Sequence, residues 1–245
     1  MRPLTAAGLL HAWEGGPALR PFDRALALLA AAQPEEGLEG LAQLTVGERD
    51  GRLLQLRQVS FGSVLRAFAA CPSCGTEWTF GLRTEDLRGV PPQRNADQLF
   101  DVKAGGVCAR FRLPTLADFA HLPAFADLAA VRRQLAHRCV IETVCDGLPT
   151  ALDSLPPELI DAMSAKMADQ DPQAEVRIAL TCSACNHSWS ALFDIAAFFC
   201  AEIAAAARRL LREVDALARA YGWREPDILA LTPWRRDAYL QLVNA

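Results

Sequence analysis

The chain has 245 residues, which is enough for one large domain or two small ones. Hydrophobic residues make up 51% of it and charged residues 22%, which excludes an intrinsically disordered protein because there is ample apolar surface to bury. The net charge of −4 excludes an overall basic field that would attract nucleic acid or an anionic membrane.

The N-terminal third predicts helices. A short helix is expected after Thr5, whose hydroxyl is suited to cap it, and the Gly15-Gly16-Pro17 run should end it. Apolar residues recur at helical spacing over residues 22–32, with Pro34 just beyond them. This pattern predicts a second helix.

Thr45 and Glu48 have the spacing of a capping box, in which the two side chains satisfy each other's backbone N–H groups. The box predicts a helix over Arg49–Ser60, with Gly62 near its C-terminal end. The pair Asp50-Gly51 would instead suit a hairpin turn. The apolar spacing favours the helix.

The middle of the chain is mixed. Leu65–Cys71 and Thr76–Leu82 predict two short strands around a tight turn, and Val107–Leu113 alternates apolar and polar residues as a strand does. Residues 83–106 are rich in Pro, Gly, Asn and Asp, which predicts a loop. Three helices are then expected, over residues 116–122, 124–139 and 156–169.

The last third predicts strand, turn and strand over Glu175–Asp194, followed by a long helix over Ile195–Tyr221 that ends at Gly222. The long helix has one apolar face because apolar residues repeat every three or four positions. This stripe consists of Ile195, Phe199, Ile203, Ala206, Leu210, Val214, Leu217 and Tyr221. Two short helices should close the chain, over residues 226–231 and 234–242.

No segment has the pattern of a membrane span, because Asp194 and Glu202 interrupt the best apolar run, 191–207. The first residues do not resemble a signal peptide. We therefore expect a cytoplasmic protein in a reducing compartment. Its eight cysteines should be thiols or metal ligands and not a disulfide framework.

An internal duplication is the strongest signal. In each copy an alternating strand leads into Cys-x-x-Cys, then Gly or Asn, then a second strand with Trp. The paired positions, offset by 111, are Cys71 and Cys182, Cys74 and Cys185, Gly75 and Asn186, and Trp78 and Trp189. Positive φ is often needed just after the second cysteine. The two tryptophans are expected to pack across the hairpins as ordinary core.

Two residues between thiols let a tight turn aim both sulfurs at one ion. Two such turns supply four thiolates, Cys71, Cys74, Cys182 and Cys185, which close a tetrahedron around one Zn²⁺. A closed site has no open position for water or substrate, so the predicted zinc is structural. Four thiolates also accept iron.

Three other interpretations stay open: two redox-active Cys-x-x-Cys pairs, coincidence among eight cysteines, and cysteines that pack together without metal. The 107 residues between Cys74 and Cys182 exceed the spacing in a compact zinc ribbon, but the matching flanks support the pairing.

His187 is expected to be a turn residue and not a ligand. The remaining cysteines are expected to be small buried side chains: Cys108, Cys139, Cys145 and Cys200.

No motif of a catalytic or phosphate-binding site is present, so we predict a protein that is not an enzyme. Zinc hairpins also occur in nucleic-acid-binding proteins, which is the alternative function. The best basic cluster for it, on the long helix, is Arg208, Arg209, Arg212 and Arg219. Acidic residues interrupt this cluster, so a solvated helix face explains it better.

Further short motifs run along the chain. They are Leu10-x-x-Trp13-Glu14, Val46-Gly-Glu-Arg-Asp50, Phe111-Arg-Leu-Pro-Thr115, Asp171-Pro-x-Ala-Glu175, Phe193-Asp-Ile195, Tyr221-Gly-Trp223 and Arg235-Arg-x-x-Tyr-Leu240. Together with the paired Cys-x-x-Cys motifs, they resemble the T-even-type phage baseplate protein and baseplate hub assembly chaperone family of contractile tails and phage-like injection systems. The resemblance covers nearly the whole chain.

The resemblance implies a structural or assembly role at a baseplate, with other tail or baseplate proteins as partners. From the sequence itself we expect no small-molecule substrate and no membrane partner, and nucleic acid is the less favoured partner. The resemblance also implies a location in the cytoplasm or in an assembled particle. It carries the four motif cysteines over as metal ligands and no catalytic residue. A partner-binding tail is expected at Tyr221, Gly222, Trp223, Arg235, Arg236 and Tyr239.

We therefore predict an α+β protein that is mainly helical, with two Cys-x-x-Cys β-hairpins forming a zinc-ribbon-like centre. Its expected regions are an N-terminal helical region (1–62), a zinc-ribbon-like region (63–194) with a helical insertion at about 115–170, and a C-terminal region of one long and two short helices (195–245).

Overall fold

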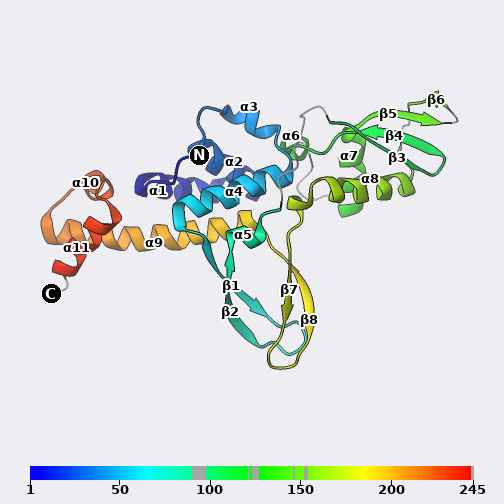
Figure 1. The fold of residues 1–245 in the computed structure, drawn as a ribbon. Coiled ribbons are helices and arrows are strands. Elements are labelled where there is room, and N and C mark those ends of the chain that lie inside the picture. Colours follow the sequence, from blue (N-terminus) through cyan, green and yellow to red (C-terminus); the bar gives the residue numbers. More distant parts are fainter. Residues whose placement is uncertain (90–97, 121, 123–126, 146, 152–153, 244–245) are drawn as a thin grey trace. The chain divides into compact units, whose positions relative to one another are not determined.

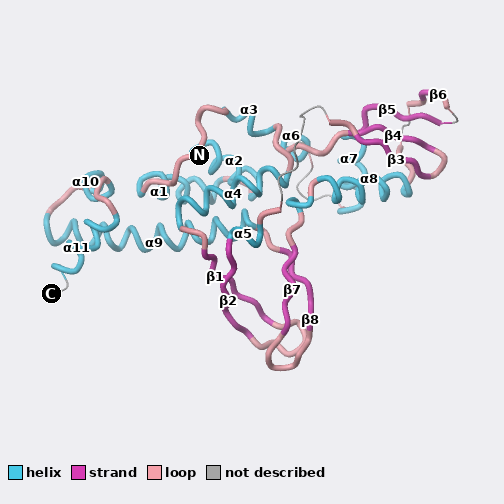
Figure 2. Tube along the Cα trace, viewed as in Figure 1, coloured by secondary structure: helices cyan, strands magenta, loops and turns pink. Residues whose placement is uncertain are grey.

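The computed structural model describes residues 1–89, 98–120, 122, 127–145, 147–151 and 154–243 (Figure 1). The chain forms two compact units. The first consists of Met1–Gly37, Leu53–Ser63 and Asp194–Ala245, and the second of Leu38–Arg52 and Val64–Phe193. Helices predominate and the strands form hairpins and one sheet (Figure 2), which confirms the predicted fold class. The division into three regions stays a prediction.

The first unit is helical. Its elements are α1 (Ala6–Gly15), η1 (Gly16–Ala18), α2 (Pro21–Ala32), the end of α4 (Val46–Phe61), α9 (Ile195–Tyr221), α10 (Glu225–Leu229) and α11 (Pro233–Val243). The Thr5 hydroxyl accepts a 3.1 Å hydrogen bond from the Gly8 N–H, which confirms the predicted cap of α1. Both α1 and α2 pack against α9.

The long helix α9 has the predicted bounds. Asp194 caps its start by accepting from the Ala197 N–H at 3.0 Å, and Gly222 ends it with φ of +67°. Its buried residues are Ile195, Phe199, Ile203, Ala207, Leu210, Val214 and Leu217. The predicted stripe was wrong at two positions: Ala207 is buried in place of Ala206, and Tyr221 is 39% exposed because it lies at the end of the helix.

The capping box at the start of α4 is formed as predicted. The Thr45 N–H donates to Glu48 Oε2 at 2.8 Å, and the Glu48 N–H donates to Thr45 Oγ1 at 3.4 Å. Asp50 and Gly51 lie inside the helix, so the alternative hairpin turn is excluded.

Within the first unit, the end of α4 is joined to α9 by an ion pair. The Arg57 guanidinium donates to both carboxylate oxygens of Glu202, at 2.8 and 2.7 Å, and to the Gly62 carbonyl at 2.6 Å. Phe61 and Phe199 pack edge to face nearby, with ring centroids 5.8 Å apart. This pairing fixes α4 against the buried face of α9.

Every strand of the described residues belongs to the second unit. Its helices are α3 (Gly37–Ala42), the start of α4, α5 (Thr84–Leu87), α6 (Leu116–Ala120), α7 (Leu128–Cys139), α8 (Pro157–Gln170) and η2 (Pro172–Ala174). Two antiparallel hairpins are formed by β1 (Val64–Ala70) with β2 (Glu77–Arg83) and by β7 (Arg177–Thr181) with β8 (Ser188–Leu192).

A four-stranded antiparallel sheet has the order β3 (Phe100–Ala104), β4 (Val107–Phe111), β5 (Val140–Cys145) and β6 (Leu148–Pro149). Helix α8 packs against β3. The buried core of this part contains Phe100, Val107, Ala109, Phe111, Leu113, Ala136, Leu155, Leu159, Ile160 and Met163. The sheet and its helices form a core separate from the two hairpins.

The predicted loop over residues 83–106 was wrong at α5 and at β3; residues 90–97 lie outside the described residues. Strand β3 pairs with β4 through Gly105 and Gly106, whose φ values are +59° and +78°. Two positive φ values are what a two-residue hairpin turn requires. The Gly-Gly pair between alternating residues was the overlooked signal.

Strands β5 and β6 and helix α3 were not predicted, although Val140–Cys145 is rich in β-branched residues. The helix expected at 116–122 ends at Ala120, and the one expected at 124–139 begins at Leu128. Residues 124–126 of that prediction lie outside the described residues. Across the described part of the chain, no helix combines the length and apolar character needed to cross a membrane.

Candidate metal centre

The two hairpins have the same register. Arg66 pairs with Gly81 in the first hairpin, and Arg177 pairs with Leu192 in the second, which are the same positions after an offset of 111. Every pair of the second hairpin matches a pair of the first in this way. The sequence duplication is therefore also a duplication of backbone pairing.

The turns of the two hairpins are also alike. The Gly75 N–H donates to the Cys71 carbonyl, and the Asn186 N–H donates to the Cys182 carbonyl, each at 2.9 Å. Gly75 has φ of +74° and Asn186 has φ of +55°, which confirms the predicted positive φ after the second cysteine. Gly and Asn are the residues that adopt this conformation most readily. This conformation turns the chain so that both sulfurs of a motif lie on one side.

Four sulfurs meet between the hairpins: Cys71, Cys74, Cys182 and Cys185. All four Sγ atoms lie within 4.8 Å of one another, and the closest pairs across the hairpins, Cys71 with Cys185 and Cys74 with Cys182, are each 3.6 Å apart. The first cysteine of each motif is buried and the second is exposed. The predicted juxtaposition of the two motifs is confirmed.

The spacing of the sulfurs fits a tetrahedral metal ion. With a Zn–S distance of about 2.3 Å, the edges of the tetrahedron are about 3.8 Å long. The two cross-hairpin distances of 3.6 Å are close to this edge. Each Cys-x-x-Cys lies in a turn between strands and not at the start of a helix, where the redox motif of thioredoxin-like proteins lies. The cluster therefore fits zinc or iron better than a redox pair.

The exposed thiols differ in acidity. Hydrogen bonds with the side chain and the backbone of Thr76 lower the pKa of Cys74 to about 6. The His187 backbone N–H acts to lower the pKa of Cys185, but the neighbouring Cys74 sulfur and burial outweigh it and raise this pKa to about 11. Within the cluster, one sulfur is thus ready to bind as a thiolate, and a cation would have to displace the proton of the other.

Beside the sulfurs, the two duplicated tryptophans are in contact. The rings of Trp78 and Trp189 pack edge to face, with centroids 5.6 Å apart, which confirms the predicted packing across the hairpins. His187 stacks on Trp189 at 5.9 Å. The sulfur cluster does not include His187, in agreement with its expected role as a turn residue.

Comparison with known proteins identifies the family. The family model of the T4 bacteriophage base plate protein matches residues 29–200, about 70% of the chain. The chain belongs to this family. No curated protein and no solved structure matches it. The match includes both Cys-x-x-Cys hairpins of this baseplate-family protein and ends before most of α9.

Motifs that carried the resemblance to the baseplate family meet in the second unit. The Gly47 N–H donates to Asp171 Oδ2 at 3.0 Å. Thr45 forms an isolated antiparallel bridge with Thr115, and the Leu116 N–H donates to the Leu44 carbonyl at 2.8 Å. Three stretches of the family match thus converge on the start of α4.

The predicted partner-binding residues of this baseplate-family chain gather at the end of the first unit, beyond the matched range. Tyr221 stacks on Trp223 with centroids 4.7 Å apart, and Tyr239 packs edge to face on Trp223 at 4.8 Å. The Arg235 guanidinium lies 5.8 Å from the Tyr239 ring centroid. Gly222 is the positive-φ residue that ends α9.

Arg236 has a structural environment. It is buried, and its Nε donates to Glu213 Oε2 at 2.7 Å, which joins α11 to α9. Trp234, which the sequence analysis did not single out, is 82% exposed on α11, and Leu242 on the same helix is 66% exposed. Apolar residues recur at every fourth position of α11, at Trp234, Ala238 and Leu242. This spacing could have indicated an exposed apolar stripe from the sequence alone.

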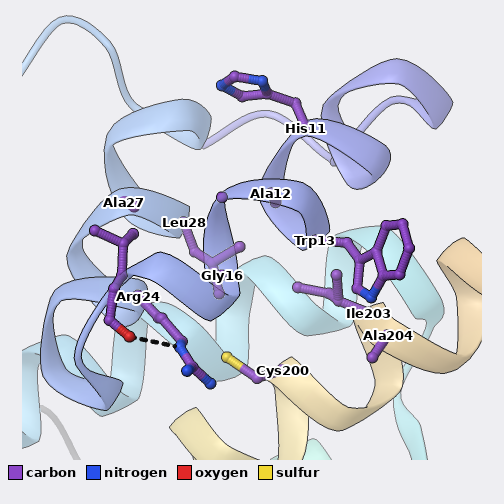
Figure 3. A pocket seen from close by; sticks show the side chains of 12 residues that line it. His11, Ala12, Trp13, Gly16, Arg24, Ala27, Leu28, Cys200, Ile203 and Ala204 are labelled. Atoms are coloured by element: carbon purple, nitrogen blue, oxygen red, sulfur yellow. Dashed lines mark hydrogen bonds between the residues drawn. The ribbon is translucent and has the colours of Figure 1, made fainter.

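The other cysteines of the baseplate-family chain lie outside the cluster. Cys139 is buried as expected, and burial raises its pKa to about 12. Cys108, Cys145 and Cys200 were also expected to be buried, but they are only partly buried. Cys200 lines a cavity in the first unit that no sequence motif indicated (Figure 3).

Proposed function

We propose that this chain is a structural or assembly protein of a contractile, phage-tail-like baseplate, where it binds other tail proteins, and that a structural zinc ion holds its two hairpins together. The observation that carries the proposal is the baseplate-family match over residues 29–200, which spans the whole four-sulfur cluster. A role as an assembly chaperone is the form of this function that we favour.

The zinc ligands in this proposal are Cys71, Cys74, Cys182 and Cys185. Their four sulfurs fill a tetrahedral coordination shell, which leaves no position for a substrate, so the ion's contribution is to folding and not to catalysis. Because 107 residues lie between Cys74 and Cys182, the ion would hold two hairpins that are distant in sequence, β1–β2 and β7–β8, against each other. Zinc binding would add directly to the folding free energy of the second unit.

The partner surface in this proposal includes the end of the first unit around Tyr221, Trp223, Arg235 and Tyr239, extended by Trp234. Aromatic residues and arginine are enriched where protein interfaces bind most strongly. An indole that is 82% exposed is costly to leave in water and gains from being covered. Arg236 would support this surface through its ion pair with Glu213.

The protein would act in the cytoplasm, where tails assemble, or as part of the finished particle. Catalysis is not part of the proposal, because the family is one of structural proteins. A closed four-sulfur site also offers no place for a reacting group.

The test of the partner function is co-purification. The tagged full chain is expressed together with the genes that neighbour its own, and the bound proteins are identified and quantified. We expect baseplate proteins to be retained at fixed stoichiometry and the Trp234→Ala variant to retain less of at least one. The matched control is Leu38→Ala, which also removes an exposed apolar side chain and should change nothing. Retention of no tail protein would contradict the proposal, as would tight DNA binding that falls steeply with salt.

The test of the metal is elemental analysis of the purified full chain. We expect about one zinc per chain and its loss in the Cys71→Ser and Cys182→Ser variants. The Cys108→Ser variant, which removes a thiol outside the cluster, should keep the metal. Iron in place of zinc would change the assigned ion, and metal-free wild-type protein would overturn the site.

A further inference from the structure

The first unit contains a cavity of about 390 Å³ between α1, η1, α2 and α9. Its walls are mostly apolar and include Trp13, Leu28 and Ile203 (Figure 3). His11, Gly15 and Ala27 are exposed and also border it. The volume falls in the range of cavities that bind small ligands or a partner's anchoring side chains.

One permanent charge lines this cavity, that of Arg24. Its Nε donates to the Leu19 carbonyl at 3.0 Å, and its two terminal nitrogens have no hydrogen-bond partner among the described residues. No Asp or Glu is among the lining residues. The neighbouring Asp23 is already paired with Arg20 at 2.7 Å. Arg24 therefore offers its planar donor edge to an anion from outside the unit.

Cys200 does not supply that anion. Figure 3 shows its sulfur directed toward the Arg24 guanidinium. Burial raises the pKa of the Cys200 thiol, so it stays uncharged at neutral pH even beside this cation. An apolar cavity that ends at a guanidinium with unbonded N–H groups is complementary to a group that is apolar on one side and carries a carboxylate on the other.

We propose that this cavity is a docking site for a protein segment that inserts a bulky apolar side chain between α1, α2 and α9 and places a carboxylate on Arg24. A protein segment fits better than a free small molecule because exposed residues border the cavity on both α1 and α2. The chain on either side of the inserted side chain can contact these residues. That the segment belongs to a tail protein rests on the proposed function. The lining residues up to Leu28 precede the family match, Cys200 is its last residue, and Ile203 and Ala204 lie beyond it.

The first experiment uses the purified full chain and two matched probes, N-acetyl-phenylalanine and its uncharged amide. Binding is followed in a two-dimensional NMR titration through the Trp13 indole N–H, which is assigned with the Trp13→Phe variant. We expect the acid to bind about threefold or more tightly than the amide, the difference expected for a partly exposed charge pair. The Arg24→Gln variant should bind both probes with the affinity of the amide.

Two further variants make the test specific. Ala27 lines the cavity from α2 and is exposed, so in Ala27→Leu the longer side chain has room to cover the cavity without breaking the helix. It should block both probes, and Ala204→Leu repeats the test from α9. Arg212→Gln removes an exposed cation of α9 that does not line the cavity and should leave binding unchanged.

The proposal would be overturned if the acid and the amide bound with equal affinity. It would also be overturned if either probe shifted other NMR signals but not that of the Trp13 indole N–H. If octanoate binds to the cavity and neither phenylalanine probe does, the proposal is also overturned, and the ligand is a small amphiphile. In the co-purification assay, Arg24→Gln and Ala27→Leu should each lose the same tail protein. If wild-type protein retains no tail protein, the proposed function fails and the partner is not a tail protein, whereas the probe titration reports on the cavity independently.

Discussion

Asp171 binds the first turn of α4 through Gly47: the Gly47 N–H donates to Asp171 Oδ2 at 3.0 Å, although the two residues are 124 positions apart. The carboxylate is buried and lies at the positive end of the helix dipole. This contact holds the start of α4 to the end of α8 within the second unit.

Gly47 has no room for a side chain. A Cβ at this position would overlap the Asp171 carboxylate and lie 3.0 Å from the Ala174 nitrogen. We expect Gly47→Ala to lower the free energy of unfolding by about 2–3 kcal/mol, because one of these groups must move. The measurement is urea unfolding followed by circular dichroism.

Gly51 provides the matched control on the same helix. A Cβ there meets only Gln173 Cγ, at 3.9 Å, and alanine has the higher helix propensity. Gly51→Ala should therefore be neutral or stabilising by up to about 1 kcal/mol. Equal stability of the two alanine variants would argue against the steric role of Gly47.

The ion pair between Arg57 and Glu202 should be costly to break from one side. Arg57 is 2% exposed, so Glu202→Gln removes a bidentate counter-charge from a buried guanidinium. We expect a loss of about 2–3 kcal/mol in unfolding free energy, below the value for fully buried pairs because Glu202 is partly exposed. Asp215→Asn, which breaks an exposed pair with Arg219 on the same helix, should cost less than about 0.5 kcal/mol. Similar losses in the two variants would show that burial of Arg57 does not determine the effect.

Asp118 should make the second unit acid-sensitive. Burial acts to raise its pKa, but the Arg112 guanidinium and the Thr115 backbone N–H outweigh burial and hold the pKa below its ordinary value. Because the folded-state pKa is lowered, the stabilisation is fully present above the ordinary Asp pKa of about 3.9 and is lost as the pH falls through the folded value. Thermal unfolding from pH 6 to pH 2 should show a shallower loss in Asp118→Asn than in wild type. Parallel pH profiles would contradict this assignment.

The tryptophan pair should stabilise the hairpins independently of the sulfurs. Replacing Trp189 by Ala removes the edge-to-face contact with Trp78 and the stacking with His187. We expect a loss of about 2–3 kcal/mol for this half-buried side chain, and a smaller loss in Trp189→Phe, which keeps an aromatic ring. The unfolding free energy of each variant is measured in buffer containing excess Zn²⁺. A Trp189→Ala protein as stable as wild type would show that the rings are not part of the hairpin core.

The sequence predicted the elements whose signals are local. The cap at Thr5, the capping box at Thr45 and Glu48, the bounds of α9 and the two Cys-x-x-Cys hairpins all depend on residues a few positions apart. The pairing of the hairpins was also predictable, because the 111-residue duplication provides long-range information that a single motif lacks.

The strands of the sheet were predicted less well. Strand β5 follows α7 without a break and pairs with β4, about 30 residues earlier, so its pairing depends on a long-range contact. The short strand β3 lies in a polar stretch, where its few apolar residues are outnumbered by turn-forming ones. Both strands are stabilised by packing on the core around α8, which sequence periodicity does not report.

By itself, the sequence determined the four-sulfur cluster and the helical frame, because cysteine spacing and apolar periodicity are written along the chain. Only the tertiary structure decided that Asp171 binds Gly47, that Arg236 is buried against Glu213 and that Arg24 ends an apolar cavity. These contacts join residues that are far apart in sequence and share no motif. Their strength comes from burial and exclusion of water, which exist only once the helices have packed.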